Sequence, residues 1–203
     1  MKYLIAVFIL IIGVCIATSC GRGCLEAQYN FNMQEVFSPE KDSILVGDTV
    51  FMESSHSTSF KDTLTTMLIE FGGSQIGVNL GLLRFPDTSA TPDGGMNDFS
   101  ILVFKGKAVG NDNIPTQNKG FLFAEDGGNY ELKIGFVAKQ KGVYAISLGN
   151  SMGIIKKRSG CEKANILITN GNVSNHLYFY INFFRGLPIS EYTKTHVYCF
   201  KVI

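Results

Sequence analysis

The chain has 203 residues, of which 45% are hydrophobic, 12% aromatic and 17% charged. This composition excludes a disordered chain, and the near balance of Lys plus Arg (18) with Asp plus Glu (17) leaves no overall basic field that would draw nucleic acid. The numbers of Phe (16), Tyr (8) and Gly (22) favour β-structure, because aromatic side chains suit half-buried pleated surfaces and glycines suit turns.

The first segment is typical of a secretory signal peptide. Lys2 precedes an uncharged, mostly apolar run over residues 3–20 that ends in small residues. The apolar part is shorter than the ~20 residues that a membrane-spanning helix needs. We therefore predict a signal peptide over residues 1–19, a lipid-anchored tether over residues 20–27 and a single domain over residues 28–203.

Membrane attachment depends on Cys20. The preceding residues Ala17, Thr18 and Ser19 resemble the bacterial lipobox, in which small residues precede a cysteine that receives diacylglycerol, although Leu is usual at the position of Ala17. Ordinary signal peptidase would cut the same bond. We predict that Cys20 is lipidated and that the chain is anchored to a membrane of the bacterial cell envelope, in the periplasm or on the outer-membrane surface.

The number of cysteines bears on this choice. Cys15 leaves with the signal peptide, so ordinary cleavage would leave four cysteines, which allow two disulfides. Lipidation of Cys20 instead leaves Cys24, Cys161 and Cys199 to form one pair and one free thiol. Because an exported chain meets an oxidising compartment, we expect a disulfide between Cys161 and Cys199.

The rest of the chain carries many short strand signals, separated by Gly, Asn, Asp and Pro. In residues 29–34, for example, apolar and polar side chains alternate with the period of a half-buried strand. Many short strands between turn residues predict a mainly β fold, an antiparallel β-sandwich. The expected strands cover residues 29–34, 44–52, 76–85, 99–109, 120–124, 130–138, 143–148, 165–169 and 195–203.

Two segments have no readable period. Residues 62–71 fit either a strand or a helix. Residues 174–184 are so apolar that a buried strand and a short helix capped by Ser174 both fit. We allow for one short helix in the second segment.

Two motifs resemble strands of immunoglobulin-like domains in bacterial surface proteins. Residues 42–50 (DSILVGDTV) are similar to a strand with the sequence V-G-D-T, and residues 142–146 (GVYAI) are similar to a late strand of such domains. With its signal peptide, the chain resembles small lipoproteins of Bacteroidota that have no assigned function. The resemblance implies an immunoglobulin-like β-sandwich in which the hydroxyl of Tyr144 bonds to upstream backbone as a tyrosine corner.

The same resemblance implies modification by O-glycans. Bacteroidota attach them to a Ser or Thr that follows Asp and precedes an apolar residue, and this pattern occurs at Ser43, Thr49 and Thr63. Acceptors must be exposed. We therefore expect Ser43 and Thr63, near the ends of loops, to be better acceptors than Thr49 in its strand.

Known catalytic and metal-binding patterns do not stand out. The three histidines lie far apart in the sequence without the H-E-x-x-H spacing of zinc sites, and there is no nucleophile elbow or phosphate loop. Asp93, Asn97 and Asp98 could form a calcium loop, but turns use the same residue types. We therefore expect no metal, no cofactor and no catalytic residue.

The expected function is non-enzymatic: an interaction or structural module of the cell envelope, whose partners are envelope proteins or glycans and not nucleic acid. The alternative is a small-ligand or glycan-binding surface protein, in which Tyr178, Phe179 and Tyr180 could contribute one stacking face, although core packing competes for this run. A pocket lined by tyrosines would favour the ligand binder. An exposed apolar patch would favour a protein partner, and two carboxylates facing across a cleft would favour an enzyme.

Overall fold

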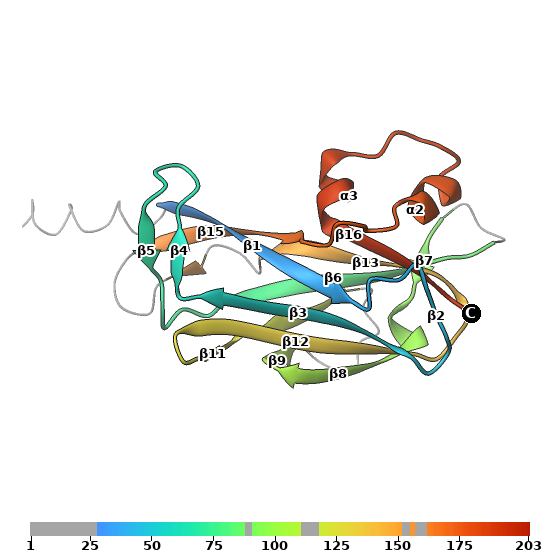
Figure 1. The fold of residues 1–203 in the computed structure, drawn as a ribbon, viewed down its shortest axis with the longest axis horizontal. Coiled ribbons are helices and arrows are strands. Elements are labelled where there is room, and N and C mark those ends of the chain that lie inside the picture. Colours follow the sequence, from blue (N-terminus) through green and yellow to red (C-terminus); the bar gives the residue numbers. More distant parts are fainter. Residues whose placement is uncertain (1–27, 88–90, 111–117, 152–154, 157–161) are drawn as a thin grey trace, which may run out of the picture.

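Two β-sheets packed face to face make up most of the molecule (Figure 1), which is a computed structural model. The predicted fold class, a mainly β sandwich of the immunoglobulin-like kind, is confirmed at the level of these two packed sheets. The structure describes residues 28–87, 91–110, 118–151, 155–156 and 162–203.

Each sheet has seven strands in the described part of the chain. The first sheet has the order β11 (Ala124–Asp126), β12 (Asn129–Ala138), β3 (Thr49–Ser57), β1 (Tyr29–Ser38), β15 (Lys163–Asn170) and β14 (Ile155–Lys156), and β8 (Phe99–Lys105) also pairs with β12. The second sheet has the order β2 (Ser43–Ile44), β16 (Val197–Val202), β13 (Gly142–Ser151), β6 (Gly77–Phe85), β10 (Asn118–Leu122) and β9 (Lys107–Val109), and β7 (Asp93–Gly94) also pairs with β6.

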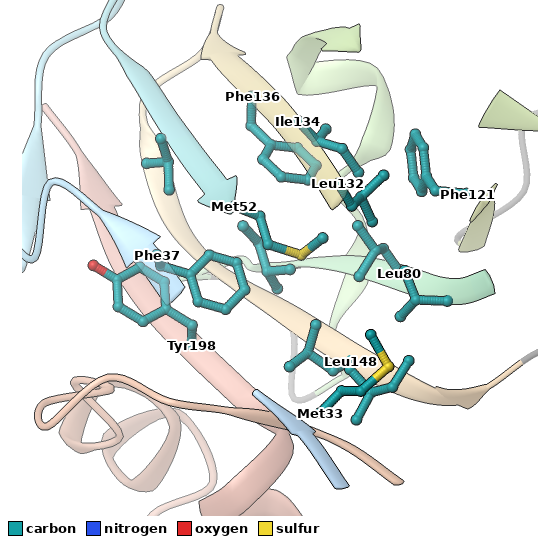
Figure 2. Packing of buried hydrophobic residues seen from close by; sticks show 14 of the residues in the cluster. Met33, Phe37, Met52, Leu80, Phe121, Leu132, Ile134, Phe136, Leu148 and Tyr198 are labelled. Carbon is teal, nitrogen blue, oxygen red and sulfur yellow. The ribbon is translucent and has the colours of Figure 1, made fainter. Parts of the chain in front are cut away.

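The core lies between the two sheets, where inward-facing side chains of both meet (Figure 2). Strand β1 shows how the sequence produces this layer, because Phe31, Met33 and Phe37 are buried while the intervening Asn32 and Gln34 are exposed. The alternation predicted for residues 29–34 is therefore confirmed. Side chains with a period of two point to opposite faces of a strand, so one face of β1 can fill the core.

Tyr144 of β13 occupies the position that the resemblance predicted for it. Its ring is fully buried, and its hydroxyl lies 3.2 Å from the carbonyl oxygen of Gln140 and 3.0 Å from Oδ2 of Asp98. The bond to Gln140 is the expected contact with upstream backbone, so the tyrosine corner is confirmed. Asp98 in turn lies 3.6 Å from the Arg84 guanidinium, so the corner joins the 3-10 turn η1 (Met96–Asp98) to β6 and β13.

Two strand pairs differ from the predicted antiparallel arrangement. Strands β1 and β15 run parallel from Tyr29 to Glu35, and β16 runs parallel to β2. Strand β1 also changes partner, because its last residues, Val36–Ser38, pair with β3 in the antiparallel direction. The alternation of side chains is the same in both directions, so the sequence pattern could not distinguish them.

Helices cover part of the second sheet on its outer side (Figure 1). The short helix allowed for in residues 174–184 is confirmed as α2 (Tyr178–Phe183), but the cap suggested at Ser174 is wrong, because the N-cap residue is Leu177 and no side chain caps the helix. A second helix, α3 (Glu191–His196), was not expected, and it shortens the strand predicted over residues 195–203 to β16. Its N-terminus is capped by Ser190, whose side chain accepts a hydrogen bond from the backbone N–H of Thr193 (3.1 Å).

The segment of residues 62–71 is mostly a turn. Residues 62–67 join β4 (Ser59–Lys61) to β5 (Leu68–Glu70), which lies within the segment, and the two strands form a small separate sheet. Asp62 holds the turn, because its carboxylate accepts hydrogen bonds from the backbone N–H groups of Asn30 and Thr65. Within the described residues, no helix has the length and apolar character needed to cross a lipid bilayer.

Candidate interaction surface

Three apolar side chains lie together on the outer face of the first sheet. Leu102 and Phe104 of β8 are 46% and 55% exposed, and Phe51 of β3 is half-buried. The ring centroids of Phe51 and Phe104 lie 5.8 Å apart. We call Phe51, Leu102 and Phe104 the Phe104 patch. The patch is exposed because Leu102 and Phe104 lie on the side of β8 that faces away from the core. Strand β8 itself lies at the lower side of the sandwich in Figure 1.

Gly135, in the middle of β12, shapes the patch. In the register of the sheet it lies between Phe51 of β3 and Leu102 of β8. A Cβ atom at this position would lie 3.1 Å from Cε2 of Phe104 and 3.4 Å from Cε1 of Phe51. The glycine therefore lets the two rings lean over β12 from both sides, in the way that aromatic side chains cover glycines in other sheets.

Charged side chains border the patch in ion pairs. The Nζ atom of Lys133 lies 2.9 Å from Oε1 of Glu53, and Nζ of Lys105 lies 2.6 Å from Oε2 of Glu131. The Lys133 ammonium also lies 5.2 Å from the centre of the Phe51 ring, within the range of a cation–π contact. An apolar centre with a polar rim is the usual anatomy of a protein–protein interface.

A hollow of about 510 Å³ adjoins the rim and contains both ion pairs. Its two carboxylates, Glu53 and Glu131, are each bonded to a lysine ammonium. Both carboxylates of this hollow therefore take part in surface ion pairs. Two further hollows, of about 610 and 430 Å³, lie elsewhere on the surface, and no tyrosine lines any of the three.

The aromatic run considered for glycan binding mainly packs against the second sheet. Phe183 stacks on Phe85 of β6 with ring centroids 4.7 Å apart, and Tyr180 contacts Phe85 edge-on at 5.8 Å. Phe179 packs against the same cluster. Tyr178 is 44% exposed, and its hydroxyl donates to Oδ2 of Asp42 at 2.9 Å.

The expected modification sites differ in exposure. Thr63 is exposed, and Ser43 is half-buried with its hydroxyl donating to Oδ1 of Asp42 at 2.9 Å. O-glycosylation at these residues stays a prediction. Cys20, the expected lipidation site, lies outside the described residues.

The expected disulfide also remains a prediction, because Cys161 lies outside the described residues. Its partner Cys199, on β16, is fully buried, and burial raises the pKa of its thiol to about 12. Of the calcium loop considered above, Asp98 is instead buried against Tyr144 and Arg84. No group of three potential metal ligands occurs among the described residues.

Glu35 is an unusual residue that the sequence analysis did not single out. It is fully buried on the core side of β1, and neither of its carboxyl oxygens has a hydrogen-bond partner. Burial raises the pKa of Glu35 from 4.5 to about 8. The nearby Ser54 hydroxyl offsets a part of this shift, although it forms no hydrogen bond of normal geometry. Extending the alternation of residues 29–34 would have placed Glu35 inward.

Glu35 lies at the fork where β1 and β3 separate. The pairing of these strands begins at Val36 opposite Glu53, and before it β1 pairs with β15. On the N-terminal side of the fork, where β1 pairs with β15, β1 and β3 are still linked by His56 of β3. Its Nε2 atom lies 3.1 Å from the carbonyl oxygen of Gln34 in β1. Burial lowers the pKa of His56, so its neutral form is favoured at this contact.

Comparison with known proteins identifies no family. No protein-family model and no curated protein matches the sequence. Among solved structures, the fold is similar to a type II cohesin domain from the cellulosome of Acetivibrio cellulolyticus, with 10% identity, a TM-score of 0.34, and 67% of this chain and 92% of that chain covered. It is also similar to a type II cohesin–X-dockerin complex of the same organism, with 12% identity, a TM-score of 0.32, and 67% and 95% covered. Likenesses at this level carry no conclusion about function.

Proposed function

We propose that the chain is a non-enzymatic protein-interaction module of a bacterial cell envelope, held to the membrane by a lipid on Cys20, and that it binds an envelope protein through the Phe104 patch. The observation that supports the binding role is the exposure of Leu102 and Phe104 beside Phe51. Large aromatic and aliphatic side chains that gather on a surface inside a polar rim favour a protein partner.

The competing ligand-binding role has less support in the geometry. Small-molecule sites are concave and combine apolar walls with convergent polar groups. The three hollows described above lack tyrosines, and the run from Tyr178 to Tyr180 is mostly engaged in packing. The Phe104 patch lies on the outer face of a sheet, which suits a broad macromolecular contact better than an enclosed ligand.

The binding role can be tested with a photo-crosslinking amino acid placed at Leu102 in the full chain, expressed in a bacterial host that exports it. The matched control is Leu167, which is 41% exposed on the outer side of β15 in the same sheet. It lies four strands away from β8, roughly 19 Å across the sheet. We expect an adduct with an envelope protein from position 102 and none from position 167.

Phe104→Lys should reduce the yield of that adduct severalfold, because it places a charge in the apolar centre of the patch. Equal adducts from positions 102 and 167, or none from either, would contradict the proposed surface. The anchor is tested separately by the mass of the mature protein. A diacylglyceryl group on Cys20 is expected, and a cleaved chain with unmodified Cys20 would exclude it.

A further inference from the structure

The turn between β4 and β5 exposes three large apolar side chains. Leu64 is 76% exposed, and Met67 and Leu68, where the chain enters β5, are 62% and 73% exposed. Turns are built mainly from Gly, Pro, Asn, Asp and Ser, and a single apolar residue on a surface is ordinary. Three of them within residues 64–68 make an apolar protrusion, which is typical of a contact site. We call Leu64, Met67 and Leu68 the Leu64 tip.

The fold holds this turn in a fixed place. Phe60 of β4 is buried in the core, and across the turn the backbone N–H of Asp62 donates to the carbonyl oxygen of Met67 at 2.9 Å. The Asp62 carboxylate points inward, where it accepts hydrogen bonds from the backbone N–H groups of Asn30 and Thr65, both at 2.8 Å. The hairpin therefore holds the apolar side chains out in the solvent, while the one acidic group of the turn stays inside.

The turn lies at the end of the sandwich where β1 begins (Figure 1). The backbone N–H of Thr63 donates to the carbonyl oxygen of Asn30, the second residue of β1, at 2.8 Å. Cys20, the predicted lipidation site, precedes Gln28 by eight residues, which reach at most about 28 Å when fully extended. A lipid on Cys20 would therefore keep the turn close to the surface of the bilayer.

We propose that the Leu64 tip inserts into the surface of the bilayer that anchors the chain, so that the domain rests on the membrane with its β4–β5 end. This inference rests on the lipid anchor of the proposed function, and it adds a membrane contact to the Phe104 patch. Apolar side chains that enter the boundary between headgroups and acyl chains leave water, and the gain grows with the apolar area that is buried.

The tether and the charges favour lipid over a protein as the partner of this tip. A short tether makes the insertion an intramolecular step with an effective concentration in the millimolar range, so even a weak contact is populated. Residues 63–68 contain no charged side chain that would oppose entry into lipid. Lys61, at the base of the turn, is exposed, and its long stem lets the ammonium group reach lipid phosphates. The ion pairs that border the Phe104 patch, by contrast, form the polar rim of a protein interface.

This membrane contact leaves the Phe104 patch free. The hairpin of β4 and β5 lies at the upper left in Figure 1, whereas β8 lies at the lower side of the sandwich. A domain that rests on its β4–β5 end therefore keeps the patch clear of the lipid, where an envelope protein can reach it. An O-glycan on Thr63, which the sequence predicts, would place a polar group beside the tip, so we expect the contact from the unmodified turn.

The test uses fluorescence, because the chain contains no tryptophan. Leu64→Trp places a single tryptophan in the Leu64 tip, and Leu45→Trp is the matched control. Leu45 is also an exposed leucine in a loop (58%), but it precedes the other end of β3, whose nine residues span roughly 27 Å. Exposure alone would let both positions meet lipid, whereas the proposed orientation selects position 64.

Each mature protein is tethered by a histidine tag, placed before Cys20, to vesicles of phosphatidylethanolamine and phosphatidylglycerol. The vesicles also contain a nickel-chelating lipid and lipids with brominated acyl chains, which quench tryptophan on contact. Because the tag replaces the acyl anchor, the result does not depend on whether cells lipidate Cys20. We expect the emission from position 64 to move to shorter wavelength and to be quenched severalfold, and the emission from position 45 to stay unchanged.

Adding Met67→Ser and Leu68→Ser to Leu64→Trp should remove most of the quenching, because the apolar area of the tip is lost. Both side chains are exposed, so the circular dichroism spectrum should stay that of a β protein. Equal quenching at positions 64 and 45, or none at position 64, would overturn the inference even if Cys20 carries a lipid in cells. Quenching at position 64 together with an unmodified Cys20 in cells would remove the anchor from the proposed function and leave the lipid contact of the tip standing.

Discussion

Replacement of Glu35 by glutamine tests how a buried, unpartnered carboxyl group affects stability. The pKa of Glu35 is about 8 in the folded chain and 4.5 when the group is in water. Between these pH values the folded chain retains a proton that the unfolded chain releases. Unfolding is therefore favoured as the pH rises from 4.5 to 8, and outside this window the group adds no further dependence on pH.

The size of the effect follows from the same two values. At 1.36 kcal/mol for each tenfold change in proton affinity, the whole window corresponds to about 5 kcal/mol of folding free energy, of which about 3 to 4 kcal/mol falls between pH 5 and pH 8. This is a large fraction of the stability of an ordinary domain. Glutamine has nearly the same shape and no charge, so Glu35→Gln should remove this dependence.

The assay is urea unfolding of the mature protein and the variant at pH 5, 6, 7 and 8. We expect similar stability at pH 5 and a variant that is more stable by about 3 to 4 kcal/mol at pH 8. Glu53→Gln is the control, because Glu53 belongs to the neighbouring strand, faces outward and forms a surface ion pair whose loss costs less than about 1 kcal/mol at every pH. A difference between wild type and Glu35→Gln that stays constant from pH 5 to pH 8 would refute the reasoning.

Three further predictions concern the core, the patch and the cysteines. Tyr144→Phe should lower the free energy of unfolding by about 1 to 3 kcal/mol, measured by urea unfolding, because buried Asp98 loses the hydroxyl that bonds to it; an unchanged midpoint would contradict this role. Gly135→Val should disturb the two rings of the Phe104 patch and destabilise the chain by about 1 to 3 kcal/mol, and a crystal structure with both rings unmoved would contradict the fit. In the denatured mature protein, Cys161 and Cys199 should be alkylated only after reduction, and mass spectrometry that finds them alkylated before reduction would exclude the predicted disulfide.

The local pattern of side chains determined much of the fold. The alternation in residues 29–34 assigned one face of β1 to the core, and the tyrosine of the GVYAI motif was expected at its corner before the sheets were known. Both predictions succeed because they depend on a period of two and on a contact with Gln140, only four residues upstream.

Contacts between distant parts of the chain decided the rest. Phe51 and Phe104 meet across Gly135 only because β3 and β8 pair with opposite edges of β12, and strand partners that far apart in the sequence leave no mark in a local pattern. The fork at which β1 leaves β3 has the same origin, and it leaves Glu35 without a partner. Sequence periodicity determined which side of each strand faces inward, but the pairing of the strands decided which outward side chains form a surface and which inward polar group is left unsatisfied.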